Sequence, residues 1–191
     1  AYVAQQLSNI GVDLYYKSTV GDNKGRIVEV LKLATGRSDI VITTGGIGPT
    51  HDDITLQCLA QAFGVPSRLH SGAHSLLREW YKDDLDQLNA ARLRMATAPE
   101  GAILMVEPIS GAMGFRIGNV YVMAGIPGIM QSMFDHVKPT LRGGKPMVVR
   151  SVRCDLPEGT IAQKLEDIQN QFPDLDVGSY PWLDGNSFGT S

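Results

Sequence analysis

Apolar residues in the first third of the chain switch between helical spacing and strand-like runs. Val3, Leu7 and Ile10 fall on one helical face, which predicts a helix that ends near Gly11. The run from Val12 to Val20 is rich in Val, Tyr, Leu and Thr and is predicted to be a strand. The predicted order continues with a helix over residues 27–36, a strand over 39–44 and a helix over 56–63. This alternation favours a three-layer α/β/α sandwich with a mostly parallel sheet.

The middle of the chain carries a second set of patterns. Residues 71–98 are polar and mostly helical in spacing. Their expected inward-facing side chains are Leu76, Leu77, Trp80 and Tyr81. A hairpin over residues 114–124 is predicted to turn at Gly118 and Asn119, and the apolar side chains that follow the turn alternate between its faces. The other elements expected here are a strand over 103–106 and a helix over 126–141.

The run from Arg142 to Pro146, RGGKP, is the best candidate for a linker. We expect residues 1–143 to form one domain and residues 146–191 to form a small α+β lobe. The elements expected in the lobe are a strand over 147–154, a helix over 160–171 and strands around Val177 and Phe188. The chain opens without a Met inside a helical pattern and stops where a strand begins. We therefore expect further residues at both ends and an incomplete lobe.

The composition is that of an ordinary globular protein and argues against a nucleic-acid-binding or membrane-spanning one. The 191 residues are 43% hydrophobic and 19% charged, and the formal net charge is −3. Without a basic field, nucleic-acid binding is not expected as the main role. No apolar run has the length of a membrane span, so no membrane partner is expected. Cys58 and Cys154 are far apart and suit free thiols in a reducing cytoplasm.

One stretch, DIVITTGGIGPTHDDITLQCLAQAF, joins a predicted buried strand directly to a helix. Gly45, Gly46 and Gly48 allow backbone N–H groups to approach an anion closely, and the helix that follows points its positive end at the same place. The stretch therefore predicts a site for a phosphate or pyrophosphate. It is not a P-loop, because it has no lysine, and His51 stands where a dinucleotide fingerprint needs Gly or Ala.

Two adjacent acids, Asp52 and Asp53, lie beside this predicted phosphate site. One interpretation is structural: Asp53 caps the helix that begins at Ile54, and Asp52 interacts with the helix dipole. The other adds Mg²⁺, which prefers one or two carboxylates together with phosphate oxygens and would remove the repulsion between acid and ligand. Four threonines offer hydroxyl groups to a ligand or to the local backbone: Thr43, Thr44, Thr50 and Thr55.

TTGGIGPTHDDIT resembles the signature of the MoaB/Mog molybdopterin-binding domain family, and more closely its version in CinA-like competence/damage-inducible proteins. Further segments that resemble this family are NIGVDLYYKSTVGDN, PEGAILMVEPISGAMGF and VMAGIPGIM. The last segment, GSYPWLDGNSFGTS, resembles the small lobe of CinA-like chains and the related domain of eukaryotic FAD synthases. The resemblance covers nearly the whole chain and implies the molybdopterin-binding fold.

The resemblance also implies roles for individual residues. It makes Asp53 the essential aspartate of the glycine motif and Asp22 a second functional aspartate. The glycines that would bind the pterin phosphate or a nucleotide pyrophosphate are Gly45, Gly46 and Gly48. The opposite wall of the site would be formed by Ser110, Gly111, Gly114, Gly125, Pro127 and Gly128. The alternative role for Asp22 is a helix N-cap, which Asn23 could share.

Some positions depart from the family pattern. Glu107 stands where the family often has Asn, and Met113 stands where it often has Pro. Glu107 adds a negative charge near the expected phosphates. The sequence does not include the deamidase domain appended to many CinA proteins or the molybdenum-inserting partner domain, so neither activity is expected of these residues.

The residues and the resemblance leave two main functions open, and a third without catalysis. The first is Mg²⁺-dependent hydrolysis of a dinucleotide pyrophosphate such as ADP-ribose or FAD, with Asp53 and Asp22 catalytic and Asp53 and Asp52 as metal ligands. The second is a molybdenum-cofactor assembly module that binds or adenylylates molybdopterin. A third is a non-catalytic nucleotide-binding relative. Members of the family are commonly homo-oligomers, so a homo-oligomer is expected.

The histidines are not expected to bind metal. His70 and His74 are four residues apart, but Ser71 and Gly72 weaken the helix between them and no HExxH motif is present. Both are predicted to be surface residues, and His51 a solvated loop residue.

Overall fold

The computed structural model describes residues 1–82, 84, 86–107, 112–146, 148–185 and 187–191. The chain divides into two compact units, Ala1–Pro146 and Met147–Ser191.

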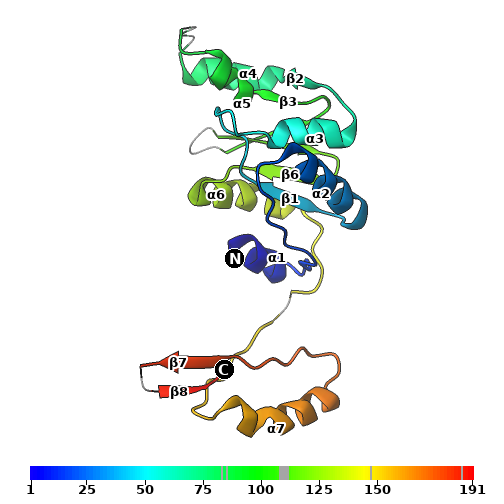
Figure 1. Ribbon diagram of the computed structural model, residues 1–191, viewed down its shortest axis with the longest axis vertical. Helices are drawn as coiled ribbons and strands as arrows, with labels where there is room; N and C mark the ends of the chain where they lie inside the picture. The colour runs from blue at the N-terminus through cyan, green and yellow to red at the C-terminus, as the bar shows by residue number, and fades with distance from the viewer. Residues whose placement is uncertain (83, 85, 108–111, 147, 186) are drawn as a thin grey trace. The chain divides into compact units, whose positions relative to one another are not determined.

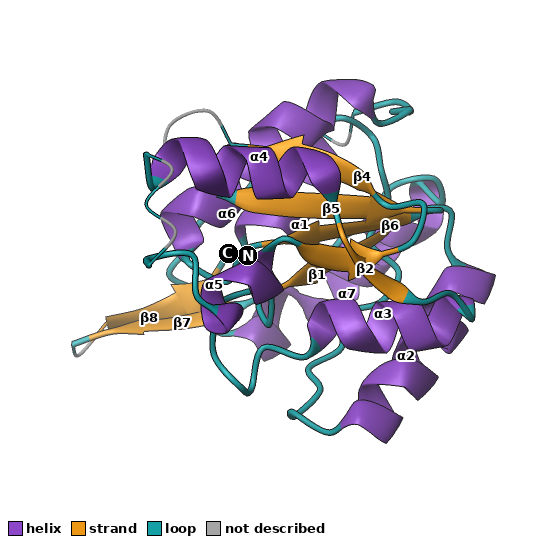
Figure 2. Cartoon of the chain, turned by 90° about the horizontal axis from the view of Figure 1, so that it is seen from above, coloured by secondary structure: helices purple, strands orange, loops and turns teal. Residues whose placement is uncertain are grey.

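The larger unit is built on a four-stranded mixed sheet (Figures 1 and 2). Its strands, in spatial order, are β1 (Val41–Thr44), β6 (Val120–Met123), β5 (Met113–Ile117) and β4 (Ile103–Val106). Only β1 and β6 run parallel, and the other two pairs are antiparallel. The prediction of a mostly parallel sheet is therefore wrong. The hairpin at Gly118 and Asn119, which was predicted, makes β5 and β6 antiparallel because so tight a turn cannot join parallel strands.

Helices cover both faces of this sheet (Figure 2). The helices α2 (Lys24–Arg37) and α3 (Thr55–Phe63) pack on one face, and α1 (Tyr2–Asn9) and α6 (Pro127–Val137) pack on the other. The central strand β6 contributes side chains to the cores on both faces of the sheet. Its two valines belong to the α2–α3 core, whereas Tyr121 and Met123 belong to the α1–α6 core. This is the alternation expected of a strand buried on both faces.

A small subregion packs against α3. It contains the antiparallel pair β2 (Ser67–Leu69) and β3 (Thr97–Pro99) and the helices α4 (Ser71–Trp80) and α5 (Ala90–Met95). The mostly helical character predicted for residues 71–98 is confirmed, except that the segment ends in β3. Leu77 is buried as expected, but the side chain of Trp80 is 62% exposed and does not face inward.

The strand predicted over Val12 to Val20 is absent, and these residues form a loop instead. Leu14, Tyr15 and Tyr16 are exposed, and the ring of Tyr16 lies under the guanidinium of Arg37 at 3.6 Å. The composition of this segment favours a strand, but a strand also needs a neighbouring strand with a free edge to bond. No described strand pairs with this segment.

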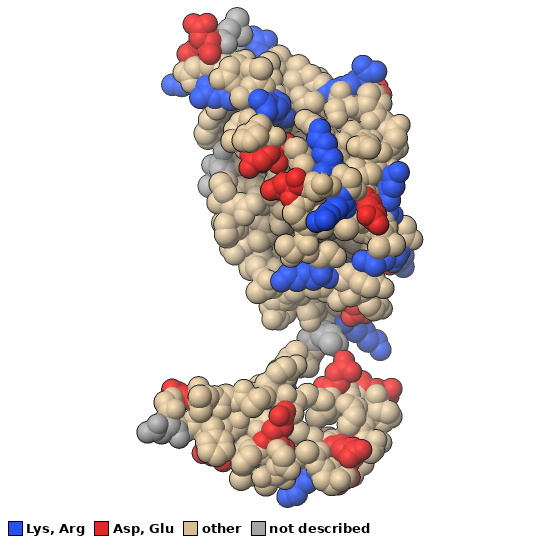
Figure 3. Space-filling view, in the orientation of Figure 1, with Lys and Arg blue, Asp and Glu red and all other residues tan. Residues whose placement is uncertain are grey.

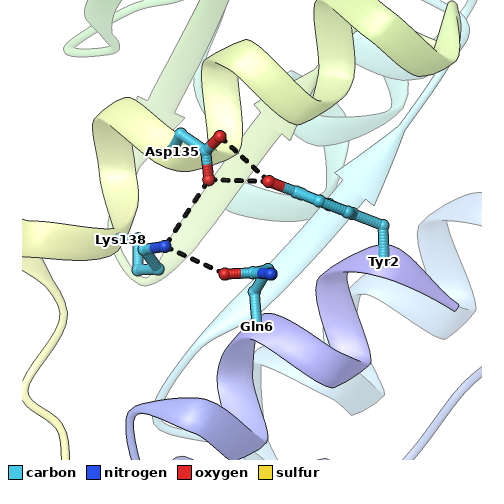
Figure 4. Close-up of polar contacts among 4 residues, drawn as sticks. All are labelled: Tyr2, Gln6, Asp135 and Lys138. Carbon is cyan, nitrogen blue, oxygen red and sulfur yellow. Dashed lines mark hydrogen bonds and ion pairs between the residues drawn. The ribbon is translucent and has the colours of Figure 1, made fainter.

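Polar contacts fasten α1 to the C-terminal part of α6 and to the 3₁₀ turn η1 (Lys138–Thr140) (Figure 4). The Tyr2 hydroxyl donates to the two carboxylate oxygens of Asp135 at 2.8 and 2.9 Å. The Lys138 ammonium lies 3.6 Å from Asp135 Oδ1 and donates to Gln6 Oε1 at 2.9 Å. The Tyr2 ring also meets Phe134 edge-on, with centroids 6.4 Å apart. The hydrogen bond to Asp135 raises the pKa of Tyr2.

We expect Tyr2→Phe to lower the thermal unfolding midpoint by roughly 1 to 3 °C, because it keeps the ring contact and removes the bonds to Asp135. Tyr15→Phe is the matched control, since Tyr15 is 79% exposed and makes no described side-chain contact. Thermal unfolding followed by circular dichroism measures both variants. Equal midpoints for the two would show that the contacts of Figure 4 contribute nothing measurable.

The smaller unit contains α7 (Glu158–Gln171) and an antiparallel hairpin of β7 (Pro181–Asp184) and β8 (Ser187–Thr190). The predicted helix and the strand around Phe188 are confirmed. The strand predicted near Val177 begins instead at Pro181. The strand predicted over 147–154 is reduced, among its described residues, to one bridge between Cys154 and Thr190.

Charged side chains are mixed in sign on the visible face of the larger unit (Figure 3). None of the described helices is long and apolar enough to cross a membrane.

Candidate functional site

The two parallel strands of the sheet, β1 and β6, are followed by helices on opposite faces. After β1 the chain enters α3 on one face of the sheet, and after β6 it enters α6 on the opposite face. In an open α/β sheet, ligands bind at such a switch point. The backbones of Gly45 and Gly125 meet here, because a Cβ added to Gly125 would lie 3.2 Å from the Gly45 Cα. The Gly45 N–H also donates to the Met123 carbonyl at 2.9 Å.

The glycine loop (residues 45–48) is shaped by left-handed backbone and by Thr55. Gly45 and Gly46 have φ values of 88° and 69°, a region that favours glycine. The Thr55 N–H donates to the Gly46 carbonyl at 3.0 Å, and its hydroxyl donates to the Gly45 carbonyl at 3.0 Å. Of the two roles left open for Thr55, the structure therefore shows bonding to the local backbone.

Asp53 is not the helix cap that one interpretation expected. The N-cap of α3 is Ile54, which makes no side-chain cap bond. Instead, the Thr50 N–H donates to Asp53 Oδ2 at 2.9 Å, and the Thr50 hydroxyl donates to the same oxygen. Gly48 lies against this carboxylate, since a Cβ there would lie 2.6 Å from Asp53 Oδ2 and would displace it. The carboxylate is thus fixed at the mouth of the loop.

Hydrogen bonding keeps both acids ionised. Partial burial acts to raise the pKa of Asp53, but bonds from the Thr50 hydroxyl and from the Gly48 and Thr50 N–H groups outweigh it, so the pKa is lowered. The pKa of Asp52 is lowered mainly by its bond with the Thr50 hydroxyl. Asp52 itself is exposed, and His51 Nδ1 lies 4.0 Å from its Oδ1.

The depressed pKa of Asp53 gives a pH-dependent stability whose sign follows from linkage. Its contribution is present above the unfolded pKa, near 3.8, and is lost as the pH falls through the lower folded value. We expect Thr50→Val to cost about 1 kcal/mol at neutral pH, after allowance for solvent screening, and progressively less as the pH falls below the unfolded pKa near 3.8.

Unfolding midpoints measured across this pH range test the prediction. Thr35→Val is the control, because the Thr35 hydroxyl donates to the Lys32 carbonyl and involves no carboxylate. A cost of Thr50→Val that stays constant with pH would contradict the assigned bonds.

The opposite wall is only partly described. Ser110 and Gly111 lie outside the described residues. Gly125, Pro127 and Gly128 are exposed at the start of α6, where Pro127 occupies the first turn. A Cβ on Gly128 would meet nothing within 4 Å, so the fold itself does not require glycine there.

The two other acidic residues considered for the site have different surroundings. Glu107 is buried, and it accepts a hydrogen bond from the Ser132 hydroxyl on α6 at 2.7 Å. Asp22 is exposed, and the cap of α2 is formed by Asn23, whose side chain accepts from the Arg26 N–H at 3.1 Å. Among the described residues no bond joins Asp22 to the glycine loop. Thr44 is exposed at the carboxyl end of β1.

His70, predicted to be a surface residue, is half-buried and has a structural role. Its Nδ1 accepts the Ala73 N–H at 3.3 Å and so caps α4. Its ring also packs edge-on against Phe115, with centroids 5.9 Å apart. The sequence offered no sign of this cap, because histidine is not among the preferred capping residues.

Two residues beside the glycine loop, one from α5 and one from β3, were not predicted from the sequence. Arg94 and Thr97 line a small cavity of about 30 Å³ together with Gly46, Gly48 and Asp53. No local pattern marks Arg94, since its proximity to the loop depends on the packing of β3 against α3. Within the described residues, no cluster of three or more His, Cys, Asp or Glu side chains forms a complete metal site. A metal here would need oxygens from a ligand.

Comparison with known proteins agrees with this geometry. The family described as "Probable molybdopterin binding domain" matches residues 1–143, and "FAD synthase, middle domain" matches residues 146–191. A protein of Symbiobacterium thermophilum named as competence-damage inducible is 34% identical over 94% of this chain and 45% of its own length. A CinA-like protein of Gloeobacter violaceus is 32% identical over 87% of this chain and 42% of its own length. The chain thus spans less than half the length of these relatives.

A solved structure shares the fold. The crystal structure of a CinA protein of unknown function from Thermoplasma acidophilum superimposes with a TM-score of 0.66 and 25% identity, over 73% of this chain and 84% of that one. The chain therefore belongs to the molybdopterin-binding domain family, in its CinA-like branch.

Proposed function

We propose that the glycine loop binds a phosphate-bearing nucleotide or pterin and that, with Mg²⁺, the site hydrolyses the pyrophosphate of a dinucleotide such as ADP-ribose or FAD. The observation that carries this proposal is the close approach of the Gly45 and Gly125 backbones at the carboxyl ends of β1 and β6, where the two following helices leave to opposite faces. Side chains at either position would fill the space through which a phosphate reaches the backbone.

The residues present suit Mg²⁺ held partly by the ligand. Asp53 and Asp52 are adjacent and both have lowered pKa values, so both are charged at neutral pH. Two carboxylates plus phosphate oxygens match the coordination that Mg²⁺ prefers. A bound Mg²⁺ would neutralise developing charge and lower the pKa of a coordinated water. Asp53 is the better ligand of the pair, because Thr50 already fixes its orientation.

The nucleotide preference has separate support from residues 146–191, which match the middle domain of FAD synthase. The competing function is binding or adenylylation of molybdopterin. The description of the family that matches residues 1–143 favours it. Both functions place a phosphate at the same glycine loop, so they differ in what the rest of the ligand contacts.

A ligand screen by thermal unfolding separates the two functions. The probes are ADP-ribose, FAD, ATP and molybdopterin, each with and without Mg²⁺. A ligand at a hundred times its Kd should add about 2.7 kcal/mol of stability. A Mg²⁺-dependent shift with ADP-ribose or FAD, followed by hydrolysis of that ligand, supports the proposal. A shift with molybdopterin alone supports the competing function, which is binding or adenylylation of molybdopterin. No shift with any probe overturns both functions.

A further inference from the structure

A cation faces the glycine loop from a different part of the chain. Arg94, in the last turn of α5, lines the same small cavity as Asp53, Gly46 and Gly48. It is the only basic residue among those described around this cavity. The cavity holds about 30 Å³, room for about one water molecule.

The backbone that carries Arg94 is held in place. Asn89 caps α5 by accepting the Arg92 N–H at 3.1 Å. The residues after the helix are anchored as well, since the His70 N–H donates to the Ala96 carbonyl at 2.8 Å. The Thr97 hydroxyl donates back to the Leu93 carbonyl at 3.0 Å. Arg94 therefore extends from a fixed base, as a ligand-binding side chain should.

The two arginines of α5 have different surroundings. Residues two apart on a helix point to nearly opposite sides. Arg92 is used by the fold, because its guanidinium lies 4.3 Å from the Tyr81 ring centroid and donates to the Gln87 carbonyl at 2.6 Å. The Arg94 guanidinium forms no hydrogen bond or ion pair with any described residue. It is available to an outside partner.

Asp53 and Arg94 line one cavity, yet no ion pair within 4.0 Å joins them in the described structure. The two Thr50 bonds hold the Asp53 carboxylate at the loop. The arrangement leaves a space with an anionic side and a cationic side. Oxygen atoms of a ligand can meet Arg94 there while a metal meets Asp53.

We propose that Arg94 binds the second phosphate of the ligand and so selects a pyrophosphate over a single phosphate. This inference rests on the proposed function. The glycine loop and a metal at Asp53 supply contacts for one phosphate, and a second phosphate linked to it needs a further donor. The planar fork of Arg matches two phosphate oxygens and forms stronger bonds than a neutral donor.

The test compares a ligand with two linked phosphates, ADP-ribose, with a ligand that has one, AMP. Calorimetry in Mg²⁺ gives the Kd of each for wild type, Arg94→Ala, Arg94→Lys and Arg68→Ala, with the bridging oxygen of the ADP-ribose pyrophosphate replaced by a methylene group so that it cannot be hydrolysed. We expect Arg94→Ala to weaken ADP-ribose binding roughly 10- to 100-fold and AMP binding less than about 3-fold. Arg94→Lys should fall between the two, because it keeps the charge and loses the fork.

Arg68→Ala is the matched control. It removes the same charge from the same unit, but Arg68 is in a surface ion pair with Glu100 at 3.1 Å. It should leave both Kd values unchanged, and unfolding midpoints will show that all variants are folded.

Three results would overturn the inference. Unchanged ADP-ribose binding in Arg94→Ala would remove Arg94 from the site and leave the proposed function standing. Equal weakening of ADP-ribose and AMP would show that Arg94 does not distinguish two phosphates from one. If wild type binds neither nucleotide, the proposed function fails and this inference fails with it.

Discussion

Asp53→Asn is expected to abolish the Mg²⁺-dependent stabilisation by ADP-ribose or FAD and to reduce their hydrolysis at least about 100-fold, the effect seen when one charge-stabilising group is removed from an active site. Asn has nearly the same shape, and its amide oxygen can still accept the bonds that Thr50 donates to Asp53 Oδ2. The loop should therefore keep its conformation, while the negative charge that a metal needs is lost. Ligand-dependent unfolding midpoints and an assay of released nucleotide measure the two effects.

Three companion variants make this result specific. Asp13→Asn removes the same charge from an exposed loop position with no described side-chain contact, and it should behave as wild type. Asp52→Asn and Asp22→Asn test which acid, if either, acts beside Asp53. We expect Asp52 to have the larger effect of the two, because it is adjacent to Asp53, whereas no described bond joins Asp22 to the glycine loop. Full Mg²⁺-dependent binding by Asp53→Asn would show that Asp53 is not a metal ligand.

The elements that sequence analysis predicted well are those whose signals are local. The hairpin between β5 and β6 turns at the predicted Gly118, which has a φ of 55°. Helix α3 ends at Phe63, as predicted, and the left-handed Gly64 closes it. Two predictions were wrong: the mostly parallel direction of the strands in the sheet, and the strand over Val12 to Val20. Each depends on which strand lies alongside, and that is decided by residues distant in sequence.

The same distinction applies to the site. The glycine loop and its acids lie within one short stretch, so their juxtaposition followed from the sequence. The hydrogen bonds that these residues form with one another did not follow from the sequence. Thr50 rather than a helix end binds Asp53, and Thr55 bonds the loop backbone. Arg94 reaches the loop only through the packing of β3 against α3, and no spacing rule along the chain could reveal it.

Gly46→Ala is the substitution expected to damage the site most through its structure. The added Cβ would lie 2.2 Å from the Thr55 Oγ1, and Gly46 has a left-handed φ of 69°. Left-handed backbone costs a non-glycine residue about 1 to 2 kcal/mol, and overpacking adds roughly 1 to 3 kcal/mol. The clash acts on the hydroxyl that holds the Gly45 carbonyl, so the loop should lose its shape as well as its stability.

We expect Gly46→Ala to lower the free energy of unfolding by roughly 2 to 5 kcal/mol and to lose all ligand-dependent stabilisation. Gly36→Ala is the matched control, because Gly36 lies in the last turn of α2 and a Cβ there meets nothing within 4 Å. That variant should gain up to about 1 kcal/mol and bind as wild type. Urea unfolding with and without ligand measures both. If Gly46→Ala were as stable as wild type, Thr55 would have to move away from the loop, and the fixed backbone cradle on which the phosphate site depends would not exist.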